Sequence, residues 1–206
     1  MPKSLNNSFF PALKRIVQDN DSYCGPAVLA MLFDYWKIQF AQNDFVEAAD
    51  VKKKIKKHGM TVEEMALSVR KLTPEFRFWY KRNSNLDEMA KIVNEYQIPV
   101  GIEWQGLFSN EEVDEDSIDD DPGHYSVVTK IDLKKGFIWI ADPYKTYAGK
   151  DRRFTILGFE RRWWDINEVV NPVTRRRKEV DDYHALFIIV PKEFLFPVEL
   201  EMNCFE

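Results

Sequence analysis

Hydrophobic residues in the first half of the chain recur at the spacing of an α-helix. Between residues 24 and 36, one side of such a helix would carry Val28, Met31, Leu32, Tyr35 and Trp36. Pro26 suits the first turn, where its missing N–H is not needed. The pattern therefore predicts a helix with one buried face and with Cys24 at its N-terminus.

Three further helices are predicted, each opened by a polar side chain with a glutamate three residues later, as in a capping box. They cover residues 44–59, 61–72 and 85–93, and the pairs are Asp44 with Glu47, Thr61 with Glu64, and Asn85 with Glu88. Lysines crowd the first of these helices, and we expect them to form a solvated face.

The pattern then changes from helical to extended. The segments rich in β-branched and aromatic residues, as strands are, cover residues 76–80, 99–104, 124–131, 137–141 and 184–190. Because helices come first and strands follow, the sequence predicts an α+β fold with an antiparallel sheet. Two charged segments are expected to be exposed loops, an acidic one over residues 109–121 and a basic one over residues 170–182.

The chain has 206 residues and is 45% apolar, which is enough to fill a core. We find no internal repeat and predict one domain over residues 1–206, with its core from about 16 to 190. No run reaches the roughly 18 to 20 apolar residues that cross a bilayer, and no signal peptide opens the chain. We therefore expect a soluble, cytoplasmic protein without a membrane segment, and leave its oligomeric state open.

The formal net charge of −5, from 34 acidic and 29 basic residues, argues against a nucleic-acid partner. Eight of the acids lie between residues 111 and 121, so the acidity is local to the loop that precedes His124. If that loop overhangs a binding cleft, it favours basic substrates, and its deletion changes substrate charge preference before stability. Otherwise it only keeps the chain solvated. Its spacing does not match a calcium-binding loop.

Cys24 is the first candidate for chemistry. A helix N-terminus lowers the pKa of a thiol placed there, which favours the nucleophilic thiolate. The alternative is a buried cysteine that serves only as a small hydrophobic residue. The second cysteine, Cys204, lies in a terminal stretch that we expect to be loosely packed, and cytosolic chemistry disfavours a disulfide between the two.

A thiol nucleophile needs a base, and the chain has three histidines. His124 begins a predicted strand directly after a Pro-Gly pair, where the chain leaves a loop for a rigid element. His58 ends the lysine-rich helix and is expected on the surface. His184 opens the last strand and is either structural or exposed.

Asp142 is the candidate that would orient the imidazole of His124, because it ends the next strand along the chain. In an antiparallel hairpin, the start of one strand lies beside the end of the next. Direct pairing of the two residues requires a five-residue loop over 131–135. A tighter turn at 134–136 requires a bulge or a diagonal contact instead. The alternative role for Asp142 is that of a turn-forming aspartate before a proline.

Gln18 lies six residues before Cys24. Its amide is close enough in sequence to donate to a developing oxyanion together with the backbone N–H of Cys24. Taken alone, it reads as an ordinary glutamine of a surface loop.

These residues in this order resemble a known family. Gln18, the stretch Cys24-Gly-Pro-Ala27 leading a helix, Gly123-His-Tyr125 and Asp142-Pro143 are similar to stand-alone papain-like cysteine peptidases of the C39 type. That bacterial group includes the bacteriocin-leader peptidases. The resemblance spans most of the chain, roughly from Ile16 to Val190.

The resemblance implies a papain-like fold, with the nucleophile on a helix and the base on a sheet across a cleft. Cys24 would be the nucleophile, His124 the general base and acid, Asp142 its orienter and Gln18 the oxyanion donor. The reaction would be hydrolysis of a peptide or amide substrate through a thioester, with no cofactor and no metal.

Three features depart from the family pattern. The acidic and basic loops are insertions, and the transporter to which bacteriocin-leader peptidases are commonly fused is not seen, so cleavage of a double-glycine leader does not follow. Two other functions remain open. A papain-like domain without turnover would be a binding module, and the same nucleophile could serve a thiol acyltransferase or amidase.

Overall fold

The computed structural model describes residues 13–106, 123–170, 177–194 and 198–205. Its helices are α1 (Cys24–Tyr35), α2 (Gln42–Ala48), α3 (Ile55–His58), α4 (Val62–Leu72), α5 (Leu86–Ala90), the π-helical turn η1 (Lys91–Glu95), α6 (Ile156–Glu160) and the 3-10 turn η2 (Val198–Leu200). Its strands are β1 (Phe76–Lys81), β2 (Val100–Trp104), β3 (His124–Asp132), β4 (Phe137–Ala141), β5 (Asp151–Thr155), β6 (Trp164–Val170), β7 (Arg177–Tyr183), β8 (Leu186–Pro191) and β9 (Asn203–Phe205).

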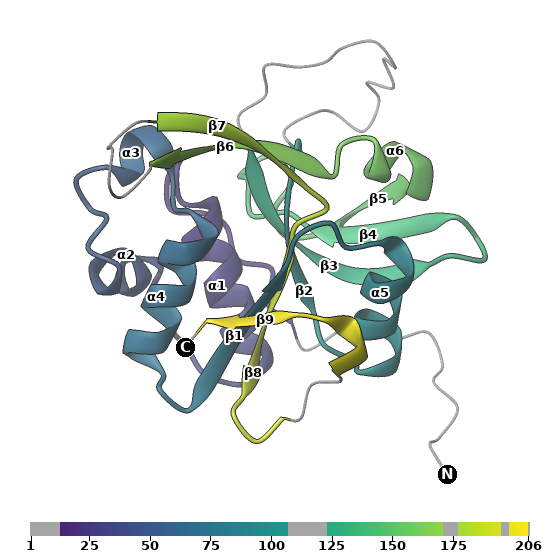
Figure 1. Cartoon of the computed structure of the whole chain (residues 1–206), viewed down its shortest axis with the longest axis horizontal. Helices are drawn as coiled ribbons and strands as arrows, with labels where there is room; N and C mark the ends of the chain where they lie inside the picture. Colours follow the sequence, from purple (N-terminus) through teal and green to yellow (C-terminus); the bar gives the residue numbers. More distant parts are fainter. Residues whose placement is uncertain (1–12, 107–122, 171–176, 195–197, 206) are drawn as a thin grey trace.

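Seven of these strands form one antiparallel sheet in the order β5-β4-β3-β2-β8-β1-β9, while β6 and β7 form a separate hairpin. Helices α1, α2 and α4 gather on one side of the molecule, and strands β3, β4 and β5 extend on the other (Figure 1). The predicted α+β fold with an antiparallel sheet is confirmed.

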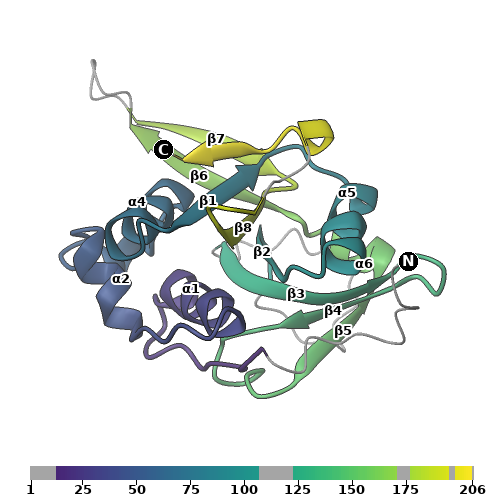
Figure 2. The same ribbon diagram turned by 90° about the horizontal axis from the view of Figure 1, so that it is seen from below.

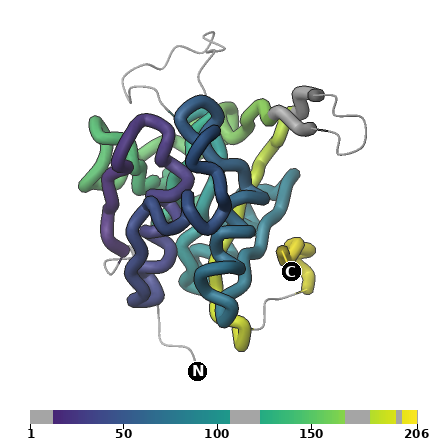
Figure 3. Tube along the Cα trace, turned by 90° about the vertical axis from the view of Figure 1, so that its left-hand side faces the viewer, coloured from purple at the N-terminus to yellow at the C-terminus, as the bar shows by residue number. Residues whose placement is uncertain are grey.

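Helix α1 lies at the centre of the core. All ten residues from Cys24 to Phe33 are buried, because the helix packs against β3, β2 and β8 and also against α2 and α4. In Figure 3 the helices of the first third of the chain, purple to blue, lie in front of the last strands in yellow. The prediction of one buried face is therefore wrong, since a helix covered on all sides is apolar all round.

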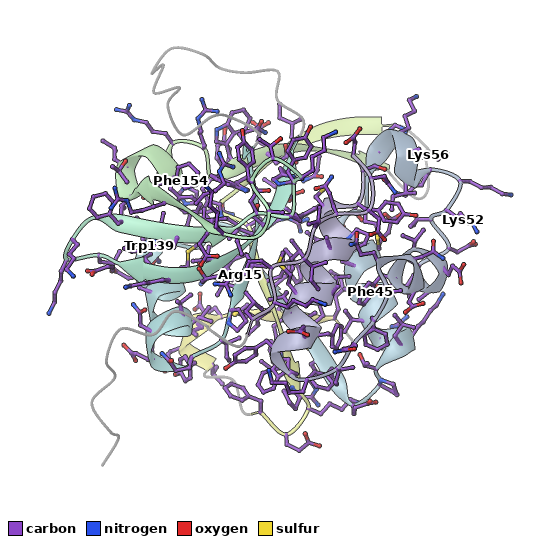
Figure 4. The ribbon with its side chains drawn as sticks, turned by 180° about the vertical axis from the view of Figure 1, so that it is seen from behind. Arg15, Phe45, Lys52, Lys56, Trp139 and Phe154 are labelled. Carbon is purple, nitrogen blue, oxygen red and sulfur yellow. The ribbon has the colours of Figure 1, made fainter. Side chains whose placement is uncertain are left out.

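The helix predicted over residues 44–59 is two short helices, α2 and α3. Helix α2 begins after Ala41, whose N–H donates to Asp44 Oδ2 over 2.8 Å, so Asp44 belongs to the first turn and not to the cap. Asp50 has a φ of 56°, a left-handed conformation that interrupts the helix. Lys52 and Lys56 extend away from the body of the molecule (Figure 4), in keeping with a solvated face.

The other two predicted helices are confirmed, the first with its full capping box and the second with Asn85 as its N-cap but, within the described residues, without the reciprocal bond from Glu88. Thr61 and Glu64 form a capping box at the start of α4, and Asn85 accepts the N–H of Glu88 at the start of α5. Helix α5 then continues as η1. Among the residues that the structure describes, no helix has the length and apolar character needed to cross a bilayer.

The predicted basic loop over residues 170–182 is a strand from Arg177 onward, while residues 171–176 lie outside the described residues. Arg177–Tyr183 pairs residue by residue with Trp164–Val170, and this ladder satisfies backbone groups that an exposed loop would leave to water. Seen from below, the hairpin lies on the opposite side of β1 from α1 (Figure 2). The acidic segment 109–121 lies outside the described residues.

The C-terminal stretch is also more ordered than predicted. Strand β9 pairs with β1, where Cys204 faces Trp79, and so extends the sheet by one strand. Cys204 is half-buried and is not in a disulfide.

The β3–β4 hairpin has the tighter of the two predicted turns. Asp132 pairs with Phe137, and the register shifts between Val128 and Lys130, which marks a bulge. Gly136 closes the turn with a φ of 73°, a conformation that favours glycine. Beyond the bulge, Val127 pairs with Ala141, so that Asp142 approaches His124 diagonally.

Candidate active site

The thiol of Cys24 lies at the first residue of α1. Cys24 is 9% exposed, and no side chain in the described part of the protein caps this helix. Pro26 has no N–H, so the uncapped amides of the first turn belong to Cys24 and Gly25. The helix therefore presents its positive end and two N–H donors at the position of the thiol.

Gly25 allows the start of α1 to pass close to two neighbouring elements. A Cβ atom at this position would lie 3.1 Å from Met65 Sδ of α4 and 3.5 Å from the ring of Tyr125 on β3. The glycine that follows Cys24 thus brings the helix terminus against the strand that begins with His124.

His124 is the first residue of β3 and is 2% exposed. Its Nε2 lies 2.8 Å from Asp142 Oδ1. An ionised carboxylate only accepts hydrogen bonds, so Nε2 carries the proton. The side chain of Cys24 is also a hydrogen-bond partner of the ring, which leaves Nδ1 as the nitrogen that faces the sulfur.

The surroundings of His124 favour the charged imidazolium. Burial of the ring opposes protonation, but the charge and hydrogen bond of Asp142, together with the hydrogen bond of Cys24, outweigh it and raise the pKa of His124 to about 10. The site can therefore hold a proton on the ring at neutral pH.

Asp142 follows β4 directly and is 2% exposed. Its Oδ1 accepts from His124 and from the backbone N–H of Tyr144, the latter over 2.9 Å. Burial opposes ionisation of this carboxyl, but its bonds to His124 and to Tyr144 and the charge of Arg152 lower its pKa. The structure thus brings three of the predicted residues, Cys24, His124 and Asp142, into one hydrogen-bonded series.

Arg152 is a member of this cluster that the sequence did not indicate. It lies on β5, is 3% exposed, and its Nη1 donates to Asp142 Oδ2 over 2.7 Å. In the structure Arg152 and Phe154 occupy alternate positions of β5 and are both buried, whereas Arg153 between them is exposed, and the sequence alone does not show this difference. When its partner is not known, a sequence does not distinguish an arginine that will be buried from one that will be exposed.

Gln18 lies beside the turn that follows Asp142, to which its backbone is hydrogen-bonded. Its N–H donates to Pro143 O over 2.9 Å, and the side chain is 7% exposed. The Nε2 group donates to Asn20 O over 2.8 Å, and within the described residues Oε1 has no hydrogen-bond partner. The expectation of an exposed loop glutamine is therefore not met. Gln18 is buried in the segment that leads to Cys24.

An ion pair anchors this segment to the sheet. Arg15, labelled in Figure 4, makes two bonds to the carboxylate of Asp151, of 2.7 and 2.8 Å. Asp151 is the residue before Arg152 on β5. The chain before Gln18 and the strand that carries Arg152 are thus held together.

A second buried polar cluster adjoins the site and was also missed. Glu103 of β2 pairs with Tyr125 of β3 and accepts its hydroxyl over 2.7 Å, and Glu103 also hydrogen-bonds with Asp165 of β6. Burial and the charge of Asp165 raise the pKa of Glu103. A Cβ atom on Gly123, the residue before His124, would lie 1.7 Å from Asp165 Oδ2. Only glycine fits there.

Among the described residues, these side chains take part neither in a cluster suited to a metal ion nor in the pocket beside α4. In the described ranges, no group of three or more His, Cys, Asp or Glu side chains is arranged to hold a metal ion. A pocket of about 300 Å³ lies between α4, β1 and β9, and its lining includes Val69, Phe78 and Phe205 but none of the four predicted site residues. His184 is structural, stacked on Trp163 with ring centroids 4.6 Å apart.

Comparisons with known proteins agree with this geometry. Residues 11–170 match the model of the Peptidase_C39 like family. One similar solved structure is the peptidase domain of Streptococcus ComA, a bi-functional ABC transporter involved in a quorum-sensing pathway, with 17% identity and a TM-score of 0.53 over 86% of this chain and 97% of that chain. Another is a double glycine motif protease from an AMS/PCAT transporter in complex with the leader peptide, with 17% identity and a TM-score of 0.53 over 86% of this chain and 90% of that chain.

No curated protein matches the chain significantly. The two solved structures establish a shared fold, that of C39 papain-like peptidase domains, and the family model covers well over half of the chain. The resemblance read from Cys24, His124 and Asp142 is confirmed at the level of family and fold: the chain belongs to the Peptidase_C39 like family.

Proposed function

We propose that the protein is a cysteine peptidase that hydrolyses an amide bond of a peptide through a thioester. The observation that carries this proposal is the continuous series of contacts from Cys24 to His124 to Asp142 at the N-terminus of α1. A nucleophile, a base bonded to it and a third group that orients the base are the parts that acyl transfer requires.

In the first step, the thiol proton of Cys24 resides on His124 Nδ1 and the thiolate attacks the carbonyl carbon. The oxyanion that forms accepts hydrogen bonds from the backbone N–H of Cys24 and from the amide of Gln18. When the tetrahedral intermediate collapses, the C–N bond breaks and the imidazolium gives its proton to the leaving amine. The acyl group is then held on sulfur as a thioester.

In the second step, neutral His124 takes a proton from water, and the hydroxide attacks the thioester carbonyl. Collapse of this second intermediate breaks the C–S bond, releases a carboxylic acid and restores the thiolate beside the imidazolium. Asp142 remains ionised throughout and stabilises the charged ring, as its lowered pKa allows.

A peptide is the substrate class that we propose. The double glycine motif protease with a related fold has a leader peptide bound. Because that protein shares 17% identity with this chain, we extend to this chain only the class of substrate and not the cleavage sequence.

The first prediction concerns the thiol itself. In a Cys204→Ser background, Cys24 is the single cysteine, and we expect iodoacetamide to alkylate it at pH 6 much faster than free cysteine, whose thiol has a pKa of about 8.5. We expect this because, in the proposed mechanism, the thiol proton resides on His124 and Cys24 is left as the reactive thiolate. The rate should fall to the level of free cysteine or below in the His124→Ala variant, and Cys24→Ala in the same background should not label.

Hydrolysis is tested with the same proteins. Incubation with a pool of unmodified peptides in heavy-oxygen water should place the heavy isotope in new carboxyl termini, detected by mass spectrometry, and Cys24→Ala should produce none. Ordinary labelling of Cys24 at every pH would reject the nucleophile. Fast labelling without any cleavage would favour the binding module, and products joined to an added amine would favour an acyltransferase.

A further inference from the structure

Arg152 carries a charge into the interior beside the candidate catalytic residues. Its Nη1 donates to Asp142 Oδ2 and to the carbonyl oxygen of Gly106, both over 2.7 Å. A buried guanidinium is costly unless it is paired and hydrogen-bonded. These two acceptors, on the segments that follow β2 and β4, therefore determine where the guanidinium lies.

Two aromatic rings fix the orientation of the Arg152 guanidinium plane. The guanidinium carbon of Arg152 lies 3.8 Å from the centroid of the Tyr147 ring and 4.8 Å from that of Phe154. Arginine stacks on aromatic faces while its N–H groups donate in the plane. The donor that contacts Asp142 is thus held in direction as well as in position.

The two oxygens of Asp142 have different partners. Oδ1 accepts from His124 and from the Tyr144 N–H, while Oδ2 accepts from Arg152. Without a partner on Oδ2, the carboxylate would be less constrained in its rotation about the Cβ–Cγ bond, because both remaining hydrogen bonds end on Oδ1. Arg152 opposes that rotation and keeps Oδ1 as the acceptor for the His124 ring.

We propose that Arg152 is a positioning residue that acts through Asp142, so that the imidazole of His124 is held toward Cys24. This inference rests on the proposed function. It differs from a purely structural role, in which Arg152 would only join β5 to the end of β2 through Gly106. The two roles differ in whether the effect of Arg152 depends on the carboxylate of Asp142.

A double-mutant cycle tests this dependence. In the Cys204→Ser background, Arg152→Met should lower the rate of Cys24 alkylation at pH 6 by about 10- to 100-fold, since a displacement of about 1 Å in a catalytic group can cost 10²-fold. In a protein that already carries Asp142→Asn, the same substitution should lower the rate less than twofold. An equal fold-loss in both backgrounds would overturn the proposal.

Two further variants separate position from charge and from folding. Arg152→Lys should retain most of the rate, because one nitrogen of Arg152 makes both hydrogen bonds and a lysine Nζ can do the same. Arg153→Met is the matched control, since Arg153 is exposed on the same strand and stacks on Phe137 instead. It should leave the rate unchanged. A loss with Arg152→Lys equal to that with Arg152→Met would contradict the proposal.

A measurement that does not need a reactive thiol separates this inference from the proposed function. The His124 Nε2 proton bonded to Asp142 should give a slowly exchanging, downfield NMR signal, which we expect to be present in the wild type and Arg152→Lys and absent in Arg152→Met. If that pattern is found while Cys24 labels like free cysteine, positioning stands and the proposed function fails. A signal that persists in Arg152→Met overturns the inference, whatever the labelling shows.

Discussion

Gln18 lies where the segment before Cys24 meets the turn after Asp142. Its backbone N–H is held by Pro143, and its side chain is buried with one N–H on Asn20 O. The amide nitrogen has a second hydrogen available for another acceptor. A substrate oxyanion formed at Cys24 is the acceptor that the proposed reaction would supply.

Gln18→Ala is therefore expected to lower kcat by about 10²- to 10³-fold, the usual cost of losing one oxyanion donor. Alkylation of Cys24 at pH 6 should change little, because the bond between Cys24 and His124 does not involve Gln18. The isosteric Gln18→Glu variant should be at least as slow in peptide hydrolysis, since it offers an acceptor in place of the donor. Unchanged kcat in both variants would remove Gln18 from the mechanism.

The residues that could be predicted from the sequence are those with a local signal. Cys24 precedes Gly-Pro at a helix start, His124 follows Pro-Gly at a strand start, and Asp142 directly follows the next strand. Arg152 has no such signal. Its burial depends on Gly106, which is 46 residues away, and on Asp142 and the Tyr147 ring, which meet it only through the folding of the chain between β4 and β5.

At the scale of elements, the β6–β7 hairpin docks on β2 through acidic side chains. Glu103 of β2 hydrogen-bonds with Asp165 of β6, and Asn167 donates both to Glu103 and to Asp182 of β7, over 3.2 and 3.1 Å. Asp182 also forms an ion pair with Arg82 over 2.8 Å. Two carboxyl groups in direct contact can share a proton, but when both are ionised they repel.

This contact predicts a stability that falls as the pH rises. Burial, and then the charge of Asp165, raise the pKa of Glu103 to about 8. Because the folded state holds this proton more tightly than the unfolded chain does, its stabilising effect is complete below the ordinary glutamate pKa of about 4.5 and is lost as the pH rises through about 8. Glu103→Gln removes the titration and can still accept the Tyr125 hydroxyl.

We therefore expect Glu103→Gln to be more stable than the wild type at pH 9 and to lose this advantage at pH 5, as measured by urea unfolding. The difference should change by about 1 to 4 kcal/mol, since one pKa unit corresponds to about 1.4 kcal/mol. Glu88→Gln is the control. Burial of Glu88 opposes ionisation, but bonds to Lys81 and Ser84 lower its pKa, so its effect should not grow between pH 5 and 9. A constant difference for Glu103→Gln would contradict the shared proton.

Elements with a local signal were predicted, namely the capped helices and the five strands rich in β-branched and aromatic residues, β1, β2, β3, β4 and β8. The capping side chains of Thr61 and Asn85 define α4 and α5 locally. Strand β7 is mostly charged, and its ladder with β6 is what makes it a strand. The break between α2 and α3 at Asp50 was not predicted, because no glycine or proline lies there in the sequence.

At the scale of the whole molecule, the order of the sheet could not be derived from local patterns. Strand β8 lies between β1 and β2, so residues about a hundred positions apart are neighbours, as in the pair Phe78 and Ile189. Helix α1 packs against both β2 and β8, and no turn joins these two strands. The family resemblance implied a papain-like fold with an antiparallel sheet, but not this order of its strands.

The buried charges of the site also set how the whole molecule responds to pH. Burial lowers the tendency of His124 to protonate, but Asp142 and Cys24 outweigh it, so its pKa rises from 6.5 to about 10. Its contribution to stability is therefore complete below pH 6.5 and is lost as the pH rises through about 10. Asp142 acts in the opposite sense. Its pKa is lowered from 3.8, so its contribution is present above that value and is lost as the pH falls.

Wild-type protein should thus have its highest melting temperature at about pH 4 to 5, because the Asp142 contribution is lost at lower pH and the Glu103 and His124 contributions are lost progressively at higher pH. At pH 8, the folded state retains protons on His124 and partly on Glu103 that the unfolded chain has lost, so unfolding should release roughly one to two protons. Calorimetric unfolding in buffers of different ionisation enthalpy measures this number. The number of protons released should fall in Asp142→Asn, because this variant lacks the charge that holds the His124 proton. Unfolding of the wild type without any proton release would show that the imidazole is neutral in the folded state.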